Sequence, residues 1–373
     1  MVLAEEPGAG PFTGTVFLPP FRREHILDTV AADKVEARFA GQPSEAEERR
    51  GRSRVLPQTS HVEEAVTLAE DVARWTWHKS RFEEIFGERS EGRFGKSWPQ
   101  GKSLAILLSF DMQADVDAAA AWSSHPNAFW ENGAVNFCDA TMRLYDAREG
   151  LPRVLRILDK YHAPATFMFC GLTAEWYPEL AHEVLEAGHE IGVHGYRHVK
   201  LCTLDPDEEL EEVTLATSAI RKFVGDRPLG WRSPIYSVTE RTLDLLRDLG
   251  YAWHSDFHDQ DFPYVLTKDR KPIVEIPPGN DDWGQYNLFT GQGSPLMGGT
   301  RYGTVEGVLS SMKGEFDVLY EESRSAPRIL HWAMHPKISG RPYPAAVLDR
   351  LLAYAVAHQG VWIATANEVA SLA

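Results

Sequence analysis

From residue 104 onward, short apolar segments alternate with amphipathic segments of helical spacing. Residues 104–110 read LAILLSF, a continuous apolar run that is typical of a strand buried on both faces. Further strands are predicted at 165–170, 190–193, 229–232, 251–255, 273–276, 329–334 and 361–364. Helices are predicted between them at 151–161, 178–187, 205–224, 239–249, 305–320 and 344–358. This alternation predicts parallel strands that are joined by helical crossovers.

The pattern fits an open doubly wound sheet as well as a closed barrel. No GxGxxG or GxxxxGK[ST] motif follows any of the predicted strands. The interpretation of the chain as a dinucleotide-binding or P-loop protein therefore lacks its main support, because in those proteins the motif glycines let the backbone approach a phosphate. The fold class predicted at this point is α/β.

The first hundred residues differ from the rest of the chain. Residues 1–51 are rich in proline, glycine and charge, which predicts an extended arm. A helix is predicted from Ser60 to Phe86, since Ser60 and Glu63 have capping-box spacing. Residues 87–102 are polar and glycine-rich, and we expect a linker there. We therefore divide the chain into an N-terminal extension, 1–102, that packs on the main domain or serves oligomerisation, and a main domain, 103–373.

Charge and composition exclude several classes of function. Lys and Arg number 38 and Asp and Glu 54, so the net charge is −16, which argues against binding nucleic acid. The three cysteines form no CxxC pair, so neither a disulfide framework nor a cysteine zinc site is expected. No apolar run approaches the roughly 18 residues of a membrane span. The start of the sequence has no export signal, so we expect a cytoplasmic protein with a small or soluble substrate.

Polar residues follow several of the predicted strands. In a parallel barrel the carboxyl ends of the strands carry the chemistry, because they meet on one face. The residues at these positions are Asp111, Asp115 and Asp117, then His194 and His198, then Arg232, and finally His335.

The two histidines are a candidate metal site. His194 and His198 are four residues apart, which places both imidazoles on one side of a helical turn. With one carboxylate they would form a 2-His-1-carboxylate set that leaves positions open for water and substrate. The alternative to a metal site is that the two histidines are a solvated or hydrogen-bonded pair. Gly195 stands where HExxH proteases carry glutamate, so that class is not expected.

The other strand-end residues have alternatives of their own. The aspartates can cap the next helix, but like charges so close together need a cation or an arginine, for which Arg232 is suited. His331 shares a strand face with His335, but only His335 lies at the strand end, so His331 is interpreted as lining. Asp282 and Trp283 lie in a loop that could form the wall of a pocket.

Five segments resemble the NodB-homology polysaccharide deacetylase superfamily, carbohydrate esterase family 4 and its relatives. The resemblance is nearest to the branch with the Helicobacter-type peptidoglycan deacetylase, PuuE-type allantoinases and cyclic imide hydrolases. It extends from about residue 104 to the end of the chain. The segments are SFDMQADVDAAAAW at 109–122, LPRVLRILDKYHAPATF at 151–167, GHEIGVHGYRH at 188–198, GWRSP at 230–234 and HPKISGRPY at 335–343.

The resemblance implies a deformed (β/α) barrel of about seven strands and a divalent metal, usually zinc. The implied metal ligands are Asp117, His194 and His198. The implied general base is Asp115, with Asp111 as its rival, because the family's first motif usually reads Asp-Asp or Asp-x-Asp. Arg232 would steady the base, and His335 would be the general acid.

The third motif departs from the family pattern, since Ile235 and Tyr236 stand where glycine is usual. Tyr236 is therefore a candidate substrate-binding residue, together with Trp283. The resemblance implies a metal-dependent hydrolase of amide C–N bonds other than peptide bonds, a deacetylase of N-acetyl amino sugars or oligosaccharides. Hydrolysis of a cyclic imide or ureide is the alternative. A catalytically silent binding protein on the same fold is a third reading, and subunit number stays open.

Overall fold

The structure is a computed structural model that describes residues 77–92, 94, 97–116, 130–131, 134–135, 141–227, 229–279, 282 and 305–373. The chain divides into two compact units, Met1–Leu68 and Ala69–Ala373. All the described residues belong to the second unit. The predicted arm and the first part of the predicted helix lie outside the described residues.

One large sheet organises this unit. Its strand order is β1-β9-β10-β8-β7-β6-β5-β2-β11, and β12 also pairs with β2. Every neighbouring pair from β10 through β8, β7, β6, β5 and β2 to β11 is parallel, whereas β9 is antiparallel to β1 and β10. The strands are β1 (Glu88–Ser90), β2 (Leu104–Met112), β5 (Thr166–Phe169), β6 (Glu190–Val193), β7 (Leu229–Trp231), β8 (Tyr251–His254), β9 (Tyr264–Lys268), β10 (Lys271–Glu275), β11 (Arg328–Met334) and β12 (Val361–Ala364). A separate two-stranded sheet joins β3 (Trp130–Glu131) and β4 (Ala134–Val135).

Strand β2 is the central element, and all nine of its residues are buried. Its first half lies between β11 and β12, and its second half lies between β11 and β5. Between β10 and β11 there is no ladder, but the Gly279 amide donates to the His331 carbonyl (3.1 Å) and the Ile329 amide to the Asp261 carbonyl (3.2 Å). These bonds connect the segments around the β9–β10 hairpin to β11, so the sheet curls toward a barrel.

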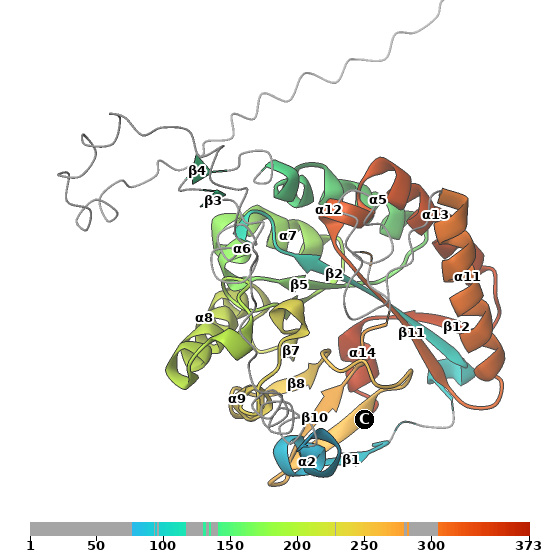
Figure 1. Ribbon diagram of the computed structural model, residues 1–373. Coiled ribbons are helices and arrows are strands. Elements are labelled where there is room, and N and C mark those ends of the chain that lie inside the picture. The colour runs from blue at the N-terminus through green and yellow to red at the C-terminus, as the bar shows by residue number, and fades with distance from the viewer. Residues whose placement is uncertain are drawn as a thin grey trace, which may run out of the picture. The chain divides into compact units, whose positions relative to one another are not determined.

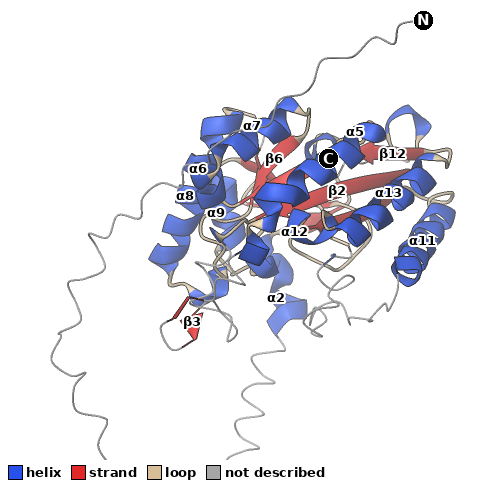
Figure 2. Ribbon diagram, turned by 90° about the horizontal axis from the view of Figure 1, so that it is seen from above, coloured by secondary structure: helices blue, strands red, loops and turns tan. Residues whose placement is uncertain are grey.

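Helices flank the parallel strands on the outside (Figures 1 and 2). Helices α8 and α9 lie beside β7 and β8, while α11 and α13 lie beside β11 and β12 (Figure 1). The helices are α5 (Leu151–Lys160), α6 (Gly171–Trp176), α7 (Pro178–Glu186), α8 (Pro206–Val224), α9 (Thr242–Asp248), α11 (Val305–Glu322), α12 (Pro336–Ser339), α13 (Pro342–Val356) and α14 (Ala366–Ala370). Helix α8 begins with a capping box, in which Asp205 accepts from the Asp207 and Glu208 amides.

The predicted linker at 87–102 is wrong. Helix α2 (Trp77–Phe86) leads into β1, which pairs with β9, and Trp98 is buried with its indole N–H bonded to the Arg328 carbonyl (2.8 Å). Phe82 and Phe86 pack against Phe257 with ring centroids 5.3 and 5.2 Å apart. Polar composition misled the prediction because a few aromatic anchors suffice to hold a short segment on a core. The described part of the extension therefore packs with the main domain.

The strands and helices predicted from residue 104 onward are present to within three residues at each end. The prediction missed β9, a strand in the antiparallel hairpin with β10. Its alternation of apolar and polar residues is short, and no helix separates it from its partner. It also missed the short helices α6, α12 and α14, which are too brief for a periodic signal.

Candidate active site

Asp111 lies at the end of β2 and is the centre of the site. Its carboxylate is 5% exposed. One oxygen, Oδ1, accepts a hydrogen bond from Arg232 Nη1 at 2.7 Å. The other, Oδ2, lies 3.5 Å from His194 Nε2 and 3.9 Å from His335 Nε2. Burial would raise the pKa of Asp111, but Arg232 and the two histidines outweigh it and lower the pKa below its usual range. Asp111 is therefore a carboxylate at neutral pH.

Arg232 follows β7 and is fully buried beneath this carboxylate. Its Nη2 donates to Ser109 Oγ (2.9 Å) and Ser255 Oγ (3.2 Å), and lies 3.2 Å from His331 Nε2. His331 Nδ1 is 3.1 Å from the Pro277 carbonyl, so it carries the hydrogen and leaves Nε2 to accept. This network holds the guanidinium in place, and His331 lines the site as predicted from its strand position.

His194 and His198 face one another across the end of β6, with ring centroids 5.0 Å apart. His194 Nδ1 lies 2.9 Å from the Arg232 carbonyl, so Nδ1 carries the hydrogen and Nε2 accepts. Gly195 and His198 have φ of +68° and +58°. A side chain at Gly195 would collide with Pro234, which keeps this turn tight. Burial lowers the pKa of His194 to about 3, so its imidazole is neutral.

The Gln113 side chain fills the space between the two histidines. Its amide nitrogen is 3.3 Å from His194 Nε2 and 2.9 Å from His198 Nε2. Its amide oxygen accepts a hydrogen bond from Lys337 Nζ. Lys337 is on α12, and its backbone N–H donates to Asp146, whose other oxygen accepts from the Ala114 amide (3.0 Å). Sequence reasoning missed Gln113, because a neutral amide is not a usual metal ligand or proton-transfer group, and it missed Lys337, which lies on the short helix α12.

His335 lies at the end of β11, and its Nε2 approaches the same Asp111 oxygen as His194 does. Its Nδ1 is 2.9 Å from Asp282 Oδ1, and its backbone N–H donates to Asp282 Oδ2 (2.8 Å). Ser339 Oγ also donates to Asp282 Oδ2 (2.6 Å). Burial lowers the pKa of His335, but Asp282 and Asp111 outweigh it and raise the pKa above its usual value. Asp282, which the sequence suggested only as a pocket wall, therefore orients His335.

The remaining predicted residues lie elsewhere or outside the described residues. The Asp115 carboxylate accepts a hydrogen bond from Tyr177 Oη (2.8 Å), while the arginine expected beside it is paired with Asp111. This geometry favours Asp111 over Asp115, our first choice for the base. Asp117 and Trp283 lie outside the described residues.

Tyr236 lies above Arg232, with the guanidinium carbon 5.9 Å from its ring centroid. Ile235 and Tyr236 both have positive φ, +56° and +52°, which costs on the order of 1–3 kcal/mol per residue. The Tyr236 ring also packs edge-on against His258 at 4.5 Å. A strained backbone thus brings an aromatic side chain to the side of the buried arginine, a position that suits a substrate contact.

The residues around Gln113 do not fit a divalent metal. Lys337 Nζ can only donate, so the Gln113 oxygen must face it and the Gln113 NH₂ must face the histidines. An NH₂ group cannot coordinate a cation, and the Lys337 ammonium adds positive charge one side chain away. Among the described residues, no group of three His, Cys, Asp or Glu side chains is arranged to hold a metal ion. The predicted set of Asp117, His194 and His198 stays a prediction, because Asp117 is not described.

A second buried cluster supports the arginine loop. His254 Nδ1 lies 3.1 Å from Asp256 Oδ2 and 2.9 Å from Glu275 Oε2. Asp256 Oδ1 accepts from the Ser233 amide (2.7 Å), next to Arg232. Burial opposes the charged form of His254, but Glu275 and Asp256 outweigh it and raise its pKa to about 9.

This cluster makes the stability of the fold depend on pH. The pKa of His254 rises from 6.5 to about 9 on folding, so the native state holds a proton that the unfolded chain has lost. The stabilisation is full below pH 6.5 and disappears as the pH rises to about 9. We expect the free energy of unfolding in urea to fall by on the order of 2 kcal/mol over this range.

A matched control separates this effect from the other histidines. His182 is exposed on α7, and a His182→Gln variant should keep the wild-type pH profile. His254→Gln should flatten the profile between pH 6.5 and 9. An equally steep fall in His254→Gln would show that another group is responsible.

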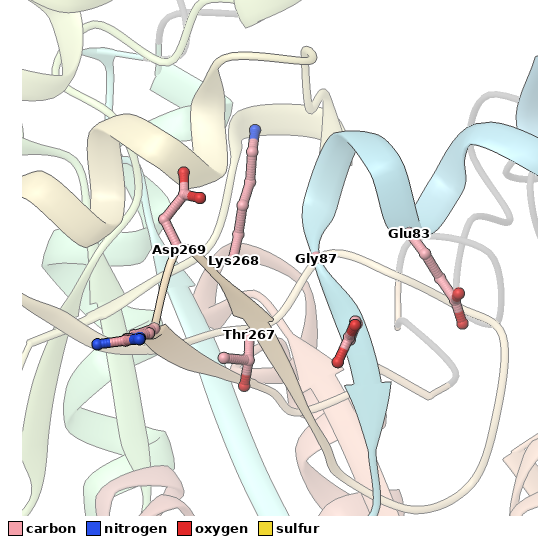
Figure 3. Close-up of a pocket in the computed structure, with 7 residues that line it drawn as sticks. Glu83, Gly87, Thr267, Lys268 and Asp269 are labelled. Atoms are coloured by element: carbon pink, nitrogen blue, oxygen red, sulfur yellow. The ribbon is translucent and has the colours of Figure 1, made fainter.

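A pocket of about 350 Å³ lies away from this site, between α2–β1 and the β9–β10 turn. Figure 3 shows Glu83 on α2 and Lys268 and Asp269 at the turn. Lys268 Nζ donates to Asp244 (2.6 Å) and the Ile85 carbonyl (2.9 Å), which connects the two elements. The pocket contains no residue of the Asp111 site.

Among the described residues, no helix combines the length and apolar character of a bilayer span.

Comparison with known proteins identifies the family. A family model described as polysaccharide deacetylase matches residues 136–254. A solved Mycobacterium smegmatis structure described as a polysaccharide deacetylase is 30% identical, with a TM-score of 0.62, and the match covers 74% of this chain and 91% of that one. This chain belongs to the polysaccharide deacetylase family. The resemblance read from the motifs is confirmed, and so is the deformed-barrel fold.

Two further similarities concern proteins of the branch that the sequence motifs resemble. The peptidoglycan deacetylase of Helicobacter pylori is 26% identical over 295 residues, which is 71% of this chain and 95% of that protein. The solved structure of PuuE allantoinase is 24% identical, with a TM-score of 0.65, and covers 77% of this chain and 94% of that one. At that identity the second similarity shows the fold alone. Family membership and the Asp111–His335 site identify a hydrolase of carbon–nitrogen bonds, and deacetylases of this family are generally metal-dependent.

Proposed function

We propose that this family member removes the acetyl group from an N-acetylated amino sugar on a small or soluble substrate. The observation that supports the proposal best is the arrangement of Asp111 between Arg232 and His335. Asp111 Oδ2 and His335 Nε2 are 3.9 Å apart and approach each other from different strands. They are a carboxylate and an imidazole that face the same point, the two kinds of group that can serve as base and acid in the hydrolysis of an amide.

The surroundings of Asp111 and His335 determine which group accepts a proton and which group donates one. Asp111, ionised and held by Arg232, takes a proton from the attacking water as its oxygen bonds to the acetyl carbon. His335 acts as the acid in its protonated form, in which Asp282 accepts from Nδ1 and Nε2 faces the reacting group. When the C–N bond breaks, His335 Nε2 gives its proton to the departing nitrogen. The products are acetic acid and a free amine, and the proton on Asp111 then returns to His335, so atoms and charge balance.

Tyr236 supports a sugar or other ring-shaped substrate. Its aromatic ring stands beside Arg232 and packs edge-on against His258 (4.5 Å). Aromatic side chains in this position stack on flat or weakly polar faces of ligands. The predicted contact from Trp283 and the predicted cytoplasmic location remain proposals. The zinc ion predicted at His194 and His198 is not part of this proposal, because Gln113 and Lys337 do not fit a divalent metal there.

Hydrolysis of a cyclic imide or ureide is the second candidate. It needs the same base and acid and a flat ring beside Tyr236. The overall similarity to the PuuE allantoinase structure extends only to the fold, so an assay with substrates of both kinds must decide between the two candidates.

Purified wild-type protein should be assayed against N-acetylglucosamine oligomers, allantoin and succinimide. Acetate release from the oligomers supports deacetylation, whereas opening of allantoin or succinimide assigns the second candidate. Folded protein that turns over none of the three would overturn the proposal and leave a binding protein on the same fold.

The His335 position gives a specific prediction. His335→Gln should lower kcat by about 10²–10⁴, because the leaving nitrogen loses its proton donor. Asp282→Asn should lower kcat less and move the alkaline limb of the pH profile to lower pH, because Asp282 is the foremost of the groups that raise the pKa of His335. The exposed His182→Gln variant is the control. An unchanged alkaline limb in Asp282→Asn would remove Asp282 from the mechanism.

A further inference from the structure

We infer that the two-histidine site of this chain holds no divalent metal, and that Gln113, fixed by Lys337, occupies the position where a metal ion would lie. The inference concerns the site of the proposed function. It rests on the proposed function only in taking this site as the place where the reaction occurs. It departs from the general metal dependence of the family.

The first step is the identity of the group between the histidines. Asp111 and Gln113 are two residues apart at the end of β2. Asp111 has the arginine that the family motif assigns to the base, so the second position of Asp-x-Asp falls on Gln113. A neutral amide therefore stands where the pattern has a metal-binding carboxylate.

The second step is the direction in which this amide points. The Lys337 ammonium has three hydrogens and no lone pair, so it must meet the Gln113 oxygen. The Gln113 NH₂ then has two hydrogens for two imidazole acceptors, at 3.3 and 2.9 Å. Reversing the amide would bring two donors together at Lys337 and remove both bonds to the histidines.

The third step is the state of His194. Its Nδ1 donates to the Arg232 carbonyl and its Nε2 accepts from Gln113, so both ring nitrogens are satisfied without a cation. Gln113 is 3% exposed and Lys337 is 6% exposed. Displacing this buried amide would leave polar groups unpaired, which costs about 1–3 kcal/mol for each group.

The fourth step is what holds the lysine. The backbone N–H of Lys337 donates to Asp146, a fully buried carboxylate that also accepts from the Ala114 amide. Ala114 follows Gln113 in the chain, so Asp146 joins both ends of the Gln113–Lys337 pair. Lys337 is a positioning residue here, since its ammonium acts through Gln113.

Zinc content after dialysis against zinc chloride and then buffer tests the inference. Wild-type protein should retain well below one zinc per chain. The variant Gln113→Asp/Lys337→Met restores a carboxylate and removes the ammonium, and should bind zinc with an affinity at least about 100-fold higher than wild type. Titration calorimetry with zinc chloride alone measures the difference, and circular dichroism checks that the variants fold. The imidazole NMR spectrum of wild-type protein should show His194 neutral with its hydrogen on Nδ1.

Wild-type protein that retains about one zinc per chain and loses it in His194→Ala would overturn the inference. Loss of that zinc in Asp117→Ala would then identify Asp117 as the third ligand, as the sequence predicts. Zinc-free wild type that hydrolyses a substrate of the panel supports both proposals. Zinc-loaded wild type that does so overturns only the inference, whereas zinc-free wild type without activity overturns only the proposed function.

Discussion

Replacing Asp111 by asparagine should lower kcat by about 10²–10⁴ while leaving the fold intact, because the attacking water loses its proton acceptor. The asparagine oxygen can still accept from Arg232, so the position keeps its shape and loses only its charge. Asp115→Asn is the matched control, since Asp115 is four residues away and its carboxylate is bonded to Tyr177. Steady-state kinetics on the substrate found active in the panel measures both variants.

The same pair decides between the two aspartates that the sequence left as rivals. A loss in Asp111→Asn with near wild-type kcat in Asp115→Asn assigns the base to Asp111. The reverse result would show that Asp115 moves from Tyr177 into the site when substrate binds, and would contradict the assignment made here.

Removing the arginine should cost more stability than any other single change in the site. Arg232→Met leaves the Asp111 carboxylate buried without its charged partner, which destabilises a protein by about 3–5 kcal/mol. The pKa of Asp111 should rise at the same time, because Arg232 is the foremost of the groups that lower it. Urea unfolding at pH 7 measures the first effect.

A double variant tests the reason for that cost. Arg232→Met/Asp111→Asn removes both charges and should recover a large part of the lost stability, while activity stays low. Arg324→Met is the control, because Arg324 pairs with Glu321 on the surface and should change stability by less than about 0.5 kcal/mol. If the double variant is no more stable than Arg232→Met, the unpaired charge is not what destabilises the single variant.

Much of the fold could be predicted because its signals are local. The apolar run of β2 and the capping box and glycine stop of α8 depend on neighbouring residues only. The β1–β9 pairing and the position of Trp98 could not be predicted, since they depend on contacts between segments more than 150 residues apart in sequence. Polar composition therefore suggested a linker where the chain forms an edge strand.

For the site, the sequence by itself determined which residue types stand at the strand ends and which family the chain belongs to. Asp111, His194, Arg232 and His335 come together because the carboxyl ends of parallel strands meet on one face. Only the tertiary structure decided which aspartate pairs with Arg232, 121 residues away, and that Asp282 orients His335. It alone also brought Lys337 to Gln113 across 224 residues. A hydrogen-bond partner that distant leaves no periodic trace in the sequence, because its place is set by how the strands and their loops pack.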